Sequence, residues 1–306
     1  MTSNGDVIRR VRAGEVELTY RLWPGNGRAI VAIHGITASH VNFIGIAERL
    51  AGRRALLAFD LRGRGQSDKP VSGYGMRQHA LDVAAAMQSL GLGRSVVVGH
   101  SMGAYVGTAL AAEFPDLVAG LVMLDGGYLL DPPPGFDPDK QLDTLLKPQV
   151  ERLRTTFESR GAYREFWRKL PTFSTEQWGP WVEAYLDYDL GGEPPSLRPR
   201  AAEPAVREDF RSMAQKSEVK QRLRAVTCPV MVIRAPAGVA PAQPPLIPDE
   251  VMAEIRDCVP SVEEHLIPGT THYTIALADP GASIVADLVD QFAARSLDRR
   301  GVQPVP

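Results

Sequence analysis

Cysteine, net charge and long apolar runs are all scarce in this sequence. Only two cysteines occur among 306 residues, too few for a scaffold held together by disulfides. The formal net charge of −2 offers no basic field to nucleic acid or anionic membranes. No apolar run approaches the length of a membrane span, and the first residues lack the apolar stretch of a secretory signal. We therefore expect a cytoplasmic protein with no membrane span and no nucleic-acid partner.

What the chain does have is a hydrophobic fraction of 44%, enough for a substantial core. Residues 6–23 alternate apolar and polar side chains around Gly14, as an antiparallel hairpin does. After it, short apolar runs that read as strands (29–35, 54–60, 95–103, 120–127, 229–235) alternate with helical patterns (41–52, 76–93, 103–114). This alternation predicts an α/β fold with a mostly parallel central sheet and helices on both faces.

The alternation is interrupted in the middle of the chain. From about 137 to 225 the sequence reads mostly as helices rich in charge and aromatic residues, without a buried strand run. The strand pattern resumes at Pro229. We predict an α/β core formed by residues 1–127 and 226–306, with residues 128–225 inserted as a helical cap over one edge of the sheet.

The strongest motif is Gly99-His100-Ser101-Met102-Gly103, which follows an apolar strand and begins a helix of small residues. Glycines two positions to either side allow a sharp turn that pushes the serine hydroxyl out of the sheet. The helix start also offers unpaired N–H groups to a developing anion. A chance turn with a helix-capping serine is the alternative, but this context favours Ser101 as a nucleophile.

On this motif, on "HGITAS" (34–39) and on "DLRGRGQSDKP" (60–70), the chain resembles the α/β-hydrolase superfamily over nearly its whole length. The resemblance implies an α/β-hydrolase fold. It also implies that the loop beginning at His34 helps to hold an oxyanion, with the backbone amides of Ile36 and Met102 as the two donors. His34 itself is expected to be a structural residue of that loop.

Six histidines are present, and one of them has to act as the base. His272 lies in "LIPGTTHYTIAL" (266–277), after an apolar strand and before the last helix. Proteins that this chain resembles place their histidine in this loop, and their order of serine, acid and histidine requires a late one. His265 comes too early in the sequence to lie in this loop. His100 flanks Ser101, but its side chain is expected to point in another direction. We predict His272 as the general base, against the alternative of a loop histidine that bonds the backbone.

The acid is missing from its commonest place in the superfamily, the loop after strand 229–235. Residues 232–248 contain no Asp or Glu, and Asp249 and Glu250 read as the first turn of a helix. Asp125 ends the strand after the nucleophile helix, which should lie beside the Ser101 strand at the ligand-facing edge. Certain haloalkane dehalogenases and fungal lactonases place their acid there. We therefore predict Asp125 as the triad acid, with a backbone-bonding turn residue as the alternative.

Together these residues predict a serine hydrolase that cleaves a carboxylic ester or lactone through an acyl-enzyme. A serine at this position argues against dehalogenase and epoxide hydrolase chemistry, for which relatives carry an aspartate. The aromatic cap and the apolar, proline-rich loop 235–248 indicate a pocket for a sizeable hydrophobic small molecule. The candidates to line it are Tyr128, Trp167, Trp178, Trp181 and Tyr273, although each Trp could simply pack the cap onto the core.

Neither a cofactor nor a metal is expected, and a homo-oligomer stays open. Two further functions also stay open. The same fold and triad serve carbon–carbon bond hydrolases of vinylogous diketones and cofactor-free perhydrolases. A non-catalytic, ligand-binding homologue with a disabled triad is the other alternative, supported by the missing acid after strand 229–235.

Overall fold

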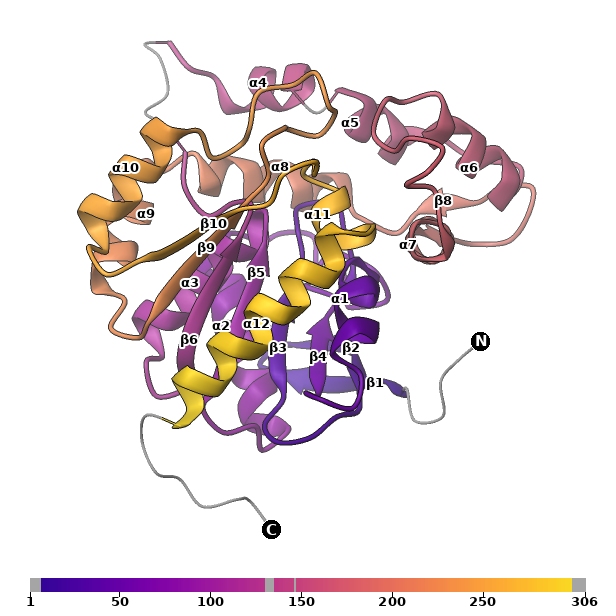
Figure 1. Cartoon of the computed structure of the whole chain (residues 1–306). Coiled ribbons are helices and arrows are strands. Elements are labelled where there is room, and N and C mark those ends of the chain that lie inside the picture. The colour runs from indigo at the N-terminus through magenta and orange to yellow at the C-terminus, as the bar shows by residue number, and fades with distance from the viewer. Residues whose placement is uncertain (1–6, 130–134, 146, 299–306) are drawn as a thin grey trace.

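The protein is built around one eight-stranded sheet, shown in the computed structural model of Figure 1. The structure describes residues 7–129, 135–145 and 147–298. The strand order is β1-β2-β4-β3-β5-β6-β9-β10. The strands are Val7–Ala13 (β1), Val16–Trp23 (β2), Ile30–Ile33 (β3), Leu56–Phe59 (β4), Ser95–His100 (β5), Val118–Leu124 (β6), Val230–Arg234 (β9) and Glu263–Leu266 (β10).

Six of these strands run parallel, and the predicted mostly parallel sheet is confirmed. The antiparallel exceptions are the β1–β2 hairpin, predicted around Gly14, and the pairing of β2 with β4. Every residue of β3, β4, β5 and β6 is buried, as expected for strands covered on both faces. The carboxyl ends of these parallel strands therefore meet at one edge, where ligands bind in such sheets.

Helices cover both faces of the sheet, as the alternating pattern predicted (Figure 1). One face carries the 3₁₀ turn His40–Phe43 (η1), Ile44–Leu50 (α1), Thr274–Leu277 (α11) and Gly281–Asp298 (α12). The other face carries Met76–Ser89 (α2), Met102–Glu113 (α3), Lys216–Ala225 (α9) and Asp249–Cys258 (α10). Helix α2 ends four residues before its predicted end, because Gly91 takes a positive φ of 64° that stops the helix.

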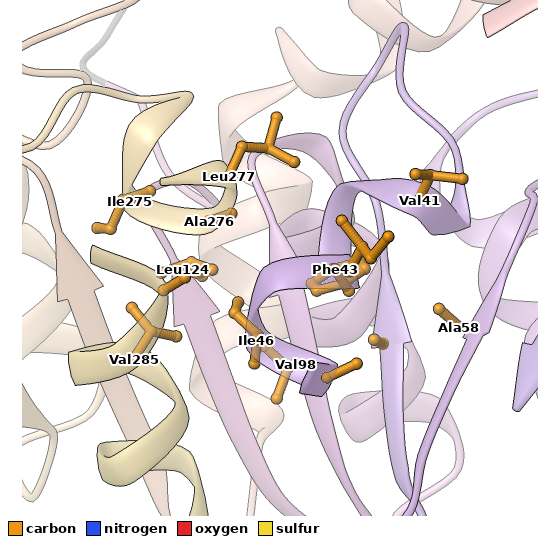
Figure 2. Close-up of a cluster of buried hydrophobic side chains, with 14 of the residues drawn as sticks. Val41, Phe43, Ile46, Ala58, Val98, Leu124, Ile275, Ala276, Leu277 and Val285 are labelled. Carbon is orange, nitrogen blue, oxygen red and sulfur yellow. The ribbon is translucent and has the colours of Figure 1, made fainter. Parts of the chain in front are cut away.

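Alternate residues of each central strand supply the two halves of the core. In β5, Val98 packs toward α1, α11 and α12, whereas Val97 packs toward α2 and α3. Figure 2 shows the first of these halves, in which Phe43, Ile46 and Val285 close over the sheet. The core thus fixes β5 and β6 from both sides and gives their carboxyl ends a rigid support.

The segment predicted as a cap forms a helical layer at one end of the sheet (Figure 1). Its elements are Pro138–Leu145 (α4), Lys147–Arg154 (α5), Arg160–Arg168 (α6), Pro180–Asp189 (α7), Leu190–Gly191 (β7), Arg198–Pro199 (β8) and Glu203–Met213 (α8). The last helix of the predicted range, α9, packs along α3 and so covers the sheet. Residues 130–134 and 146 of the range lie outside the described residues.

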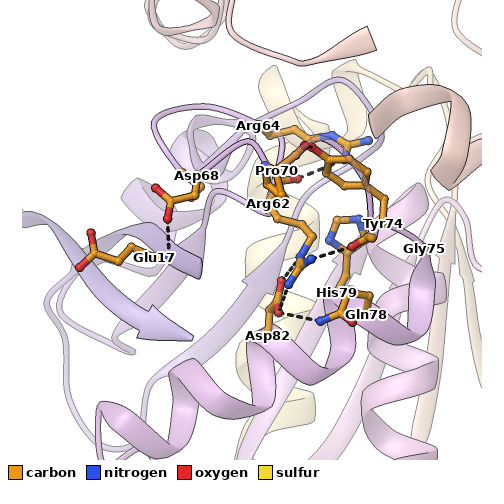
Figure 3. A network of polar contacts seen from close by, with 12 residues as sticks. Glu17, Arg62, Arg64, Asp68, Pro70, Tyr74, Gly75, Gln78, His79 and Asp82 are labelled. Carbon is orange, nitrogen blue, oxygen red and sulfur yellow. Dashed lines mark hydrogen bonds and ion pairs between the residues drawn. The ribbon is translucent and has the colours of Figure 1, made fainter. Parts of the chain in front are cut away.

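A buried ionic cluster joins cap helix α8 to the core. The Asp209 carboxylate binds Arg64 at 2.5 Å and the His79 ring at 2.8 Å, and it accepts the Gly75 amide at 2.6 Å. Figure 3 shows Arg64 and His79 converging from the 60–70 loop and from α2, beside the Arg62–Asp82 pair. Burial alone would raise the pKa of Asp209, but the charges of His79 and Arg64 outweigh it and lower the pKa to about 2.

Removing this carboxylate should loosen the cap. Because Asp209→Asn leaves Arg64 buried without its counter-charge, we expect the free energy of unfolding at pH 7 to fall by about 3–5 kcal/mol. The depressed pKa means that the stabilisation is present above the ordinary value of 3.8 and is lost as the pH falls toward 2. The difference between wild type and variant should therefore shrink in acid. Urea unfolding at pH 7 and pH 3 measures both effects.

Asp143→Asn is the matched control, because Asp143 lies on cap helix α4 in a half-exposed pair with Arg207. An exposed pair of this kind contributes about 1 kcal/mol or less. Equal losses in the two variants, or a difference that does not depend on pH, would contradict the role given to the buried cluster.

Candidate active site

The turn between β5 and α3 places Ser101 at the carboxyl edge of the sheet. Ser101 has a φ of 57°. Among the described residues other than glycine, only Ser101 and Asp125 have a positive φ. The turn needs its two glycines: a Cβ on Gly103 would lie 1.9 Å from the Ile33 carbonyl oxygen, and one on Gly99 would lie 2.2 Å from that of Gly103. A strained backbone held by such close packing is typical of a functional position.

Asp125 follows the last residue of β6 and lies directly beside this turn. It is fully buried and has a φ of 45°. Its amide donates to the Ile233 carbonyl of β9 at 2.7 Å, and its Oδ1 accepts the Ala235 amide at 3.0 Å. The strand after which the sequence lacks an acid therefore contributes an N–H donor to the acid of the neighbouring strand.

His272 lies in the loop between β10 and α11 and points its ring at Asp125. Its Nδ1 lies 2.7 Å from Asp125 Oδ2. A carboxylate oxygen accepts hydrogen bonds, so this contact fits a ring that carries its proton on Nδ1 and its lone pair on Nε2. The His272 amide also donates to the Gly238 carbonyl at 2.9 Å. His272 and Ser101 line the same cavity, so the structure brings the three residues predicted as a triad to one place.

Two residues that the sequence did not predict for the site also line this cavity: His100, which contacts His272, and Asn42, which contacts His100. The His100 ring stacks on the His272 ring with centroids 4.6 Å apart, and its Nε2 donates to the His272 carbonyl at 3.0 Å. The Asn42 amide donates to His100 Nδ1 at 3.1 Å. Burial, and then the neighbouring His272, lower the pKa of His100 well below its ordinary value, so this ring is neutral. His100 can therefore position His272 without competing for its proton.

The loop after β3 brings Ile36 to the same cavity. A Cβ on Gly35 would lie 3.4 Å from Ser101 Oγ, so this loop passes directly over the hydroxyl. Arg64 Nε donates to the Ile36 carbonyl at 3.0 Å and holds the loop in place. Within the residues that the structure describes, the Ile36 and Met102 amides donate to no protein acceptor. Their role as oxyanion donors stays a prediction that this arrangement allows.

His34 is occupied in its loop, as expected. Its Nδ1 donates to the Gly35 carbonyl at 2.7 Å, and its Nε2 accepts the Leu61 amide at 3.0 Å. Burial lowers the pKa of His34 to about 4, although the charge of Asp60 opposes this shift. The ring is therefore neutral near pH 7 and ties two loops of the carboxyl edge together.

A cavity of about 620 Å³ opens above Ser101, between the sheet edge and the cap. Apolar side chains of the cap and of the proline-rich loop make up most of its wall, including Phe136, Phe210, Val239, Pro244 and Leu246. The prediction that loop 235–248 borders the pocket agrees with this arrangement. A cavity of this size suits a drug-sized, mostly apolar ligand.

Of the five side chains predicted to line the pocket, Tyr273 lies on the cavity wall. The other four do not line it, and each has a packing partner instead. Trp167 is buried against Tyr273 and Phe173, and Trp178 packs on Phe173. Trp181 donates its indole N–H to Glu48 of α1 at 2.7 Å, and the Tyr128 hydroxyl donates to Glu254 at 3.0 Å. For these four the structure corrects the prediction in favour of packing.

The described ranges 7–129, 135–145 and 147–298 contain neither a cluster of metal ligands nor a helix that could span a membrane. Nowhere in them do three His, Cys, Asp or Glu side chains gather as metal ligands would. No helix in these ranges combines the length and the apolarity needed to cross a bilayer.

Known proteins resemble this chain in sequence and in fold. The chain is 29% identical to 2-(acetamidomethylene)succinate hydrolase of Mesorhizobium japonicum over 276 residues, 89% of this chain and 91% of that protein. A crystal structure of E-2-(acetamidomethylene)succinate hydrolase superposes with a TM-score of 0.77 at 26% identity, covering 94% and 98% of the two chains. A thermophilic esterase from Thermogutta terrifontis shares the fold, with a TM-score of 0.67 at 21% identity and coverage of 95% and 98%.

The family model of the alpha/beta hydrolase fold matches residues 28–279, which include most of both core segments and the whole segment predicted as a cap. The match spans the β5–α3 turn, the end of β6 and the loop that carries His272, the three places where the candidate site is built. With its sheet order, its covered faces and this match, the chain belongs to the alpha/beta hydrolase family.

Proposed function

We propose that this protein is a serine hydrolase that cleaves a carboxylic ester or lactone of a neutral, mostly hydrophobic small molecule. The observation that carries the proposal is the 2.7 Å bond between His272 Nδ1 and Asp125 Oδ2 at a cavity that Ser101 also lines. A histidine oriented in this way presents a basic Nε2 to a serine hydroxyl. The strained turn that exposes Ser101 supports the same role.

In the proposed reaction Ser101 Oγ adds to the ester carbonyl carbon while His272 Nε2 takes the hydroxyl proton. The Ile36 and Met102 amides stabilise the oxygen that becomes negative. The carbon–oxygen bond to the leaving alcohol then breaks, and His272 returns the proton to that alcohol. Asp125 holds the Nδ1–H tautomer and stabilises the imidazolium in between. Water, activated by His272, releases the acid and restores Ser101.

The name of the Mesorhizobium relative includes a succinate, which carries carboxylates at neutral pH. A substrate with carboxylates fits this cavity poorly, because the lining of the cavity is mostly apolar. The one Lys or Arg among its described lining residues is Lys216, whose ammonium lies 2.9 Å from Glu254. Bringing a carboxylate into such a cavity would remove its hydration without supplying an unpaired cation. A neutral ester or lactone is the better match.

A fluorophosphonate probe and a substrate panel test the proposal together. We expect stoichiometric labelling at Ser101, identified by peptide mass spectrometry, with fluoride displaced from phosphorus by the serine oxygen. We also expect turnover of p-nitrophenyl esters or aryl lactones, and little turnover of a vinylogous diketone. Faster cleavage of the diketone would transfer the proposal to a carbon–carbon bond hydrolase. Absence of both labelling and turnover would leave a ligand-binding homologue.

A further inference from the structure

We propose that the leaving group of the substrate carries a neutral hydrogen-bonding group, a carboxamide or a hydroxyl, bound by Gln149, Tyr185 and Tyr273. We call these three side chains the polar corner. The inference rests on the proposed ester or lactone hydrolysis and adds the chemical class of its substrate. Two members of the corner come from cap helices α5 and α7, and the third follows His272.

The polar corner interrupts a mostly apolar wall. All three residues line the cavity, and all are buried, with exposed fractions of 5% for Gln149, 3% for Tyr185 and 8% for Tyr273. Among the described residues, Gln149 Oε1 has no hydrogen-bond partner although it is shielded from water. A buried acceptor without a donor is costly, so a rotation of the Gln149 side chain that brings Oε1 to a ligand donor in the cavity is favoured.

The two hydroxyls of the corner are available as neutral donors. Burial raises the pKa of Tyr185 well above its ordinary value, and the nearby Tyr273 adds to this shift. Burial also raises the pKa of Tyr273, against the nearby charge of Arg152 and the neighbouring Gln149 side chain. Both phenols therefore stay protonated at neutral pH. The corner offers an amide acceptor next to two O–H groups, and a carboxamide or a hydroxyl can both donate to and accept from such a set.

The nearest cation does not make the corner a carboxylate site. Arg152 lies behind it, buried, with Nη1 donating to the Tyr163 hydroxyl and to the Asp189 carboxylate. Its guanidinium also lies over the rings of Tyr163 and Trp167. Asp189 thus neutralises the charge of Arg152, and Arg152 does not line the cavity. A neutral group is therefore favoured over an anion at this position.

The polar corner lies on the side of the leaving group. The Tyr273 ring packs edge-on against the His272 ring, with centroids 5.8 Å apart. His272 has to reach the leaving oxygen in order to return the proton to it. The alcohol part of an ester therefore lies next to His272 and within the neighbourhood of Tyr273. Selectivity from this corner should appear when the alcohol is varied and the acyl group is kept.

Three butanoate esters of equally sized alcohols, ending in a carboxamide, a carboxylate and an isopropyl group, provide the test. We expect kcat/KM to be about tenfold higher for the carboxamide than for either other ester, the factor of one good hydrogen bond. In Gln149→Leu and in Tyr185→Phe the ratio of carboxamide to isopropyl ester should fall at least threefold. Because the ratio is taken within each variant, loss of folded protein cancels. Gln88→Leu, an exposed change on α2, should leave the ratio unchanged.

The outcomes separate this inference from the proposed function. If the fluorophosphonate does not label Ser101 and none of the three esters is cleaved, the proposed function fails. If Ser101 is labelled and the isopropyl ester is cleaved, the hydrolase stands. A preference for the carboxylate, or a ratio that neither Gln149→Leu nor Tyr185→Phe changes, then overturns the polar corner alone.

Discussion

Replacing Ser101 with alanine should lower kcat for the best ester of the panel by a factor of roughly 10⁴ to 10⁶. Without the hydroxyl no acyl-enzyme forms, and only the oxyanion donors and the binding of substrate still accelerate attack by water. The variant should keep its fold, because alanine can replace serine within the tight turn without new contacts. Steady-state kinetics with active-site titration of the wild type measure the loss.

Ser72→Ala serves as the control for this variant, because Ser72 is exposed in the loop before α2. Its kcat should match that of the wild type. A Ser101→Ala protein that melts at the wild-type temperature and still turns over the ester within tenfold of the wild type would remove Ser101 from the mechanism.

Asp125→Asn should lower kcat by a factor of roughly 10⁴ and leave the melting temperature nearly unchanged. An asparagine can keep its Oδ1 on the Ala235 amide, where the aspartate now accepts a bond at 3.0 Å. Its NH₂ group would then face His272 Nδ1, which would have to accept instead of donate. The ring proton would move to Nε2, and the base would lose the lone pair that it needs for Ser101. Kinetics and thermal melting of the same preparation separate the two effects.

Asp249→Asn is the matched control, since Asp249 begins α10 after the loop that lacks an acid. Its side chain is 85% exposed and pairs with Arg234 at 2.7 Å on the surface. We expect kcat to stay within twofold of the wild type. Full activity in Asp125→Asn combined with a large loss in Asp249→Asn would reverse the assignment of the acid.

The sequence predicted the parts of the site that depend on strand ends. The position of Ser101 could be predicted because its turn requires glycine at fixed positions on both sides, so the residue types reflect the geometry. The position of Asp125 could be predicted because parallel strands bring their carboxyl ends to one edge, and β6 pairs with β5 along its length. In both cases the backbone direction alone determines where the side chain starts.

The parts that depend on how a helix is rotated could not be predicted in this way. The aromatic residues of the cap were visible in the sequence, but Trp167 faces Tyr163 and Phe173, whereas Tyr185 faces the cavity. Tertiary packing decides which face of a short cap helix meets the core. The spacing of aromatic residues in the sequence does not reveal this face. The position of Gln149 on the cavity wall could not be predicted for a related reason. A single glutamine on a polar helix has nothing that marks it as buried.

The loop of residues 235–248 makes its hydrogen bonds to Asp125 and His272 through main-chain atoms. Ala235 offers its amide to Asp125, and Gly238 offers its carbonyl to His272. Every residue type except proline carries both atoms. Exchange of side chains from 239 onward, other than that of Gln243, whose Oε1 accepts the Val239 amide, therefore leaves these two hydrogen bonds in place. The residues that orient Asp125 and His272 and the residues that shape the cavity wall therefore lie in different parts of this loop. A library confined to 239–248 could change the substrate preference of the proposed hydrolase, since mutations there change the wall of the cavity and spare Ser101, Asp125 and His272.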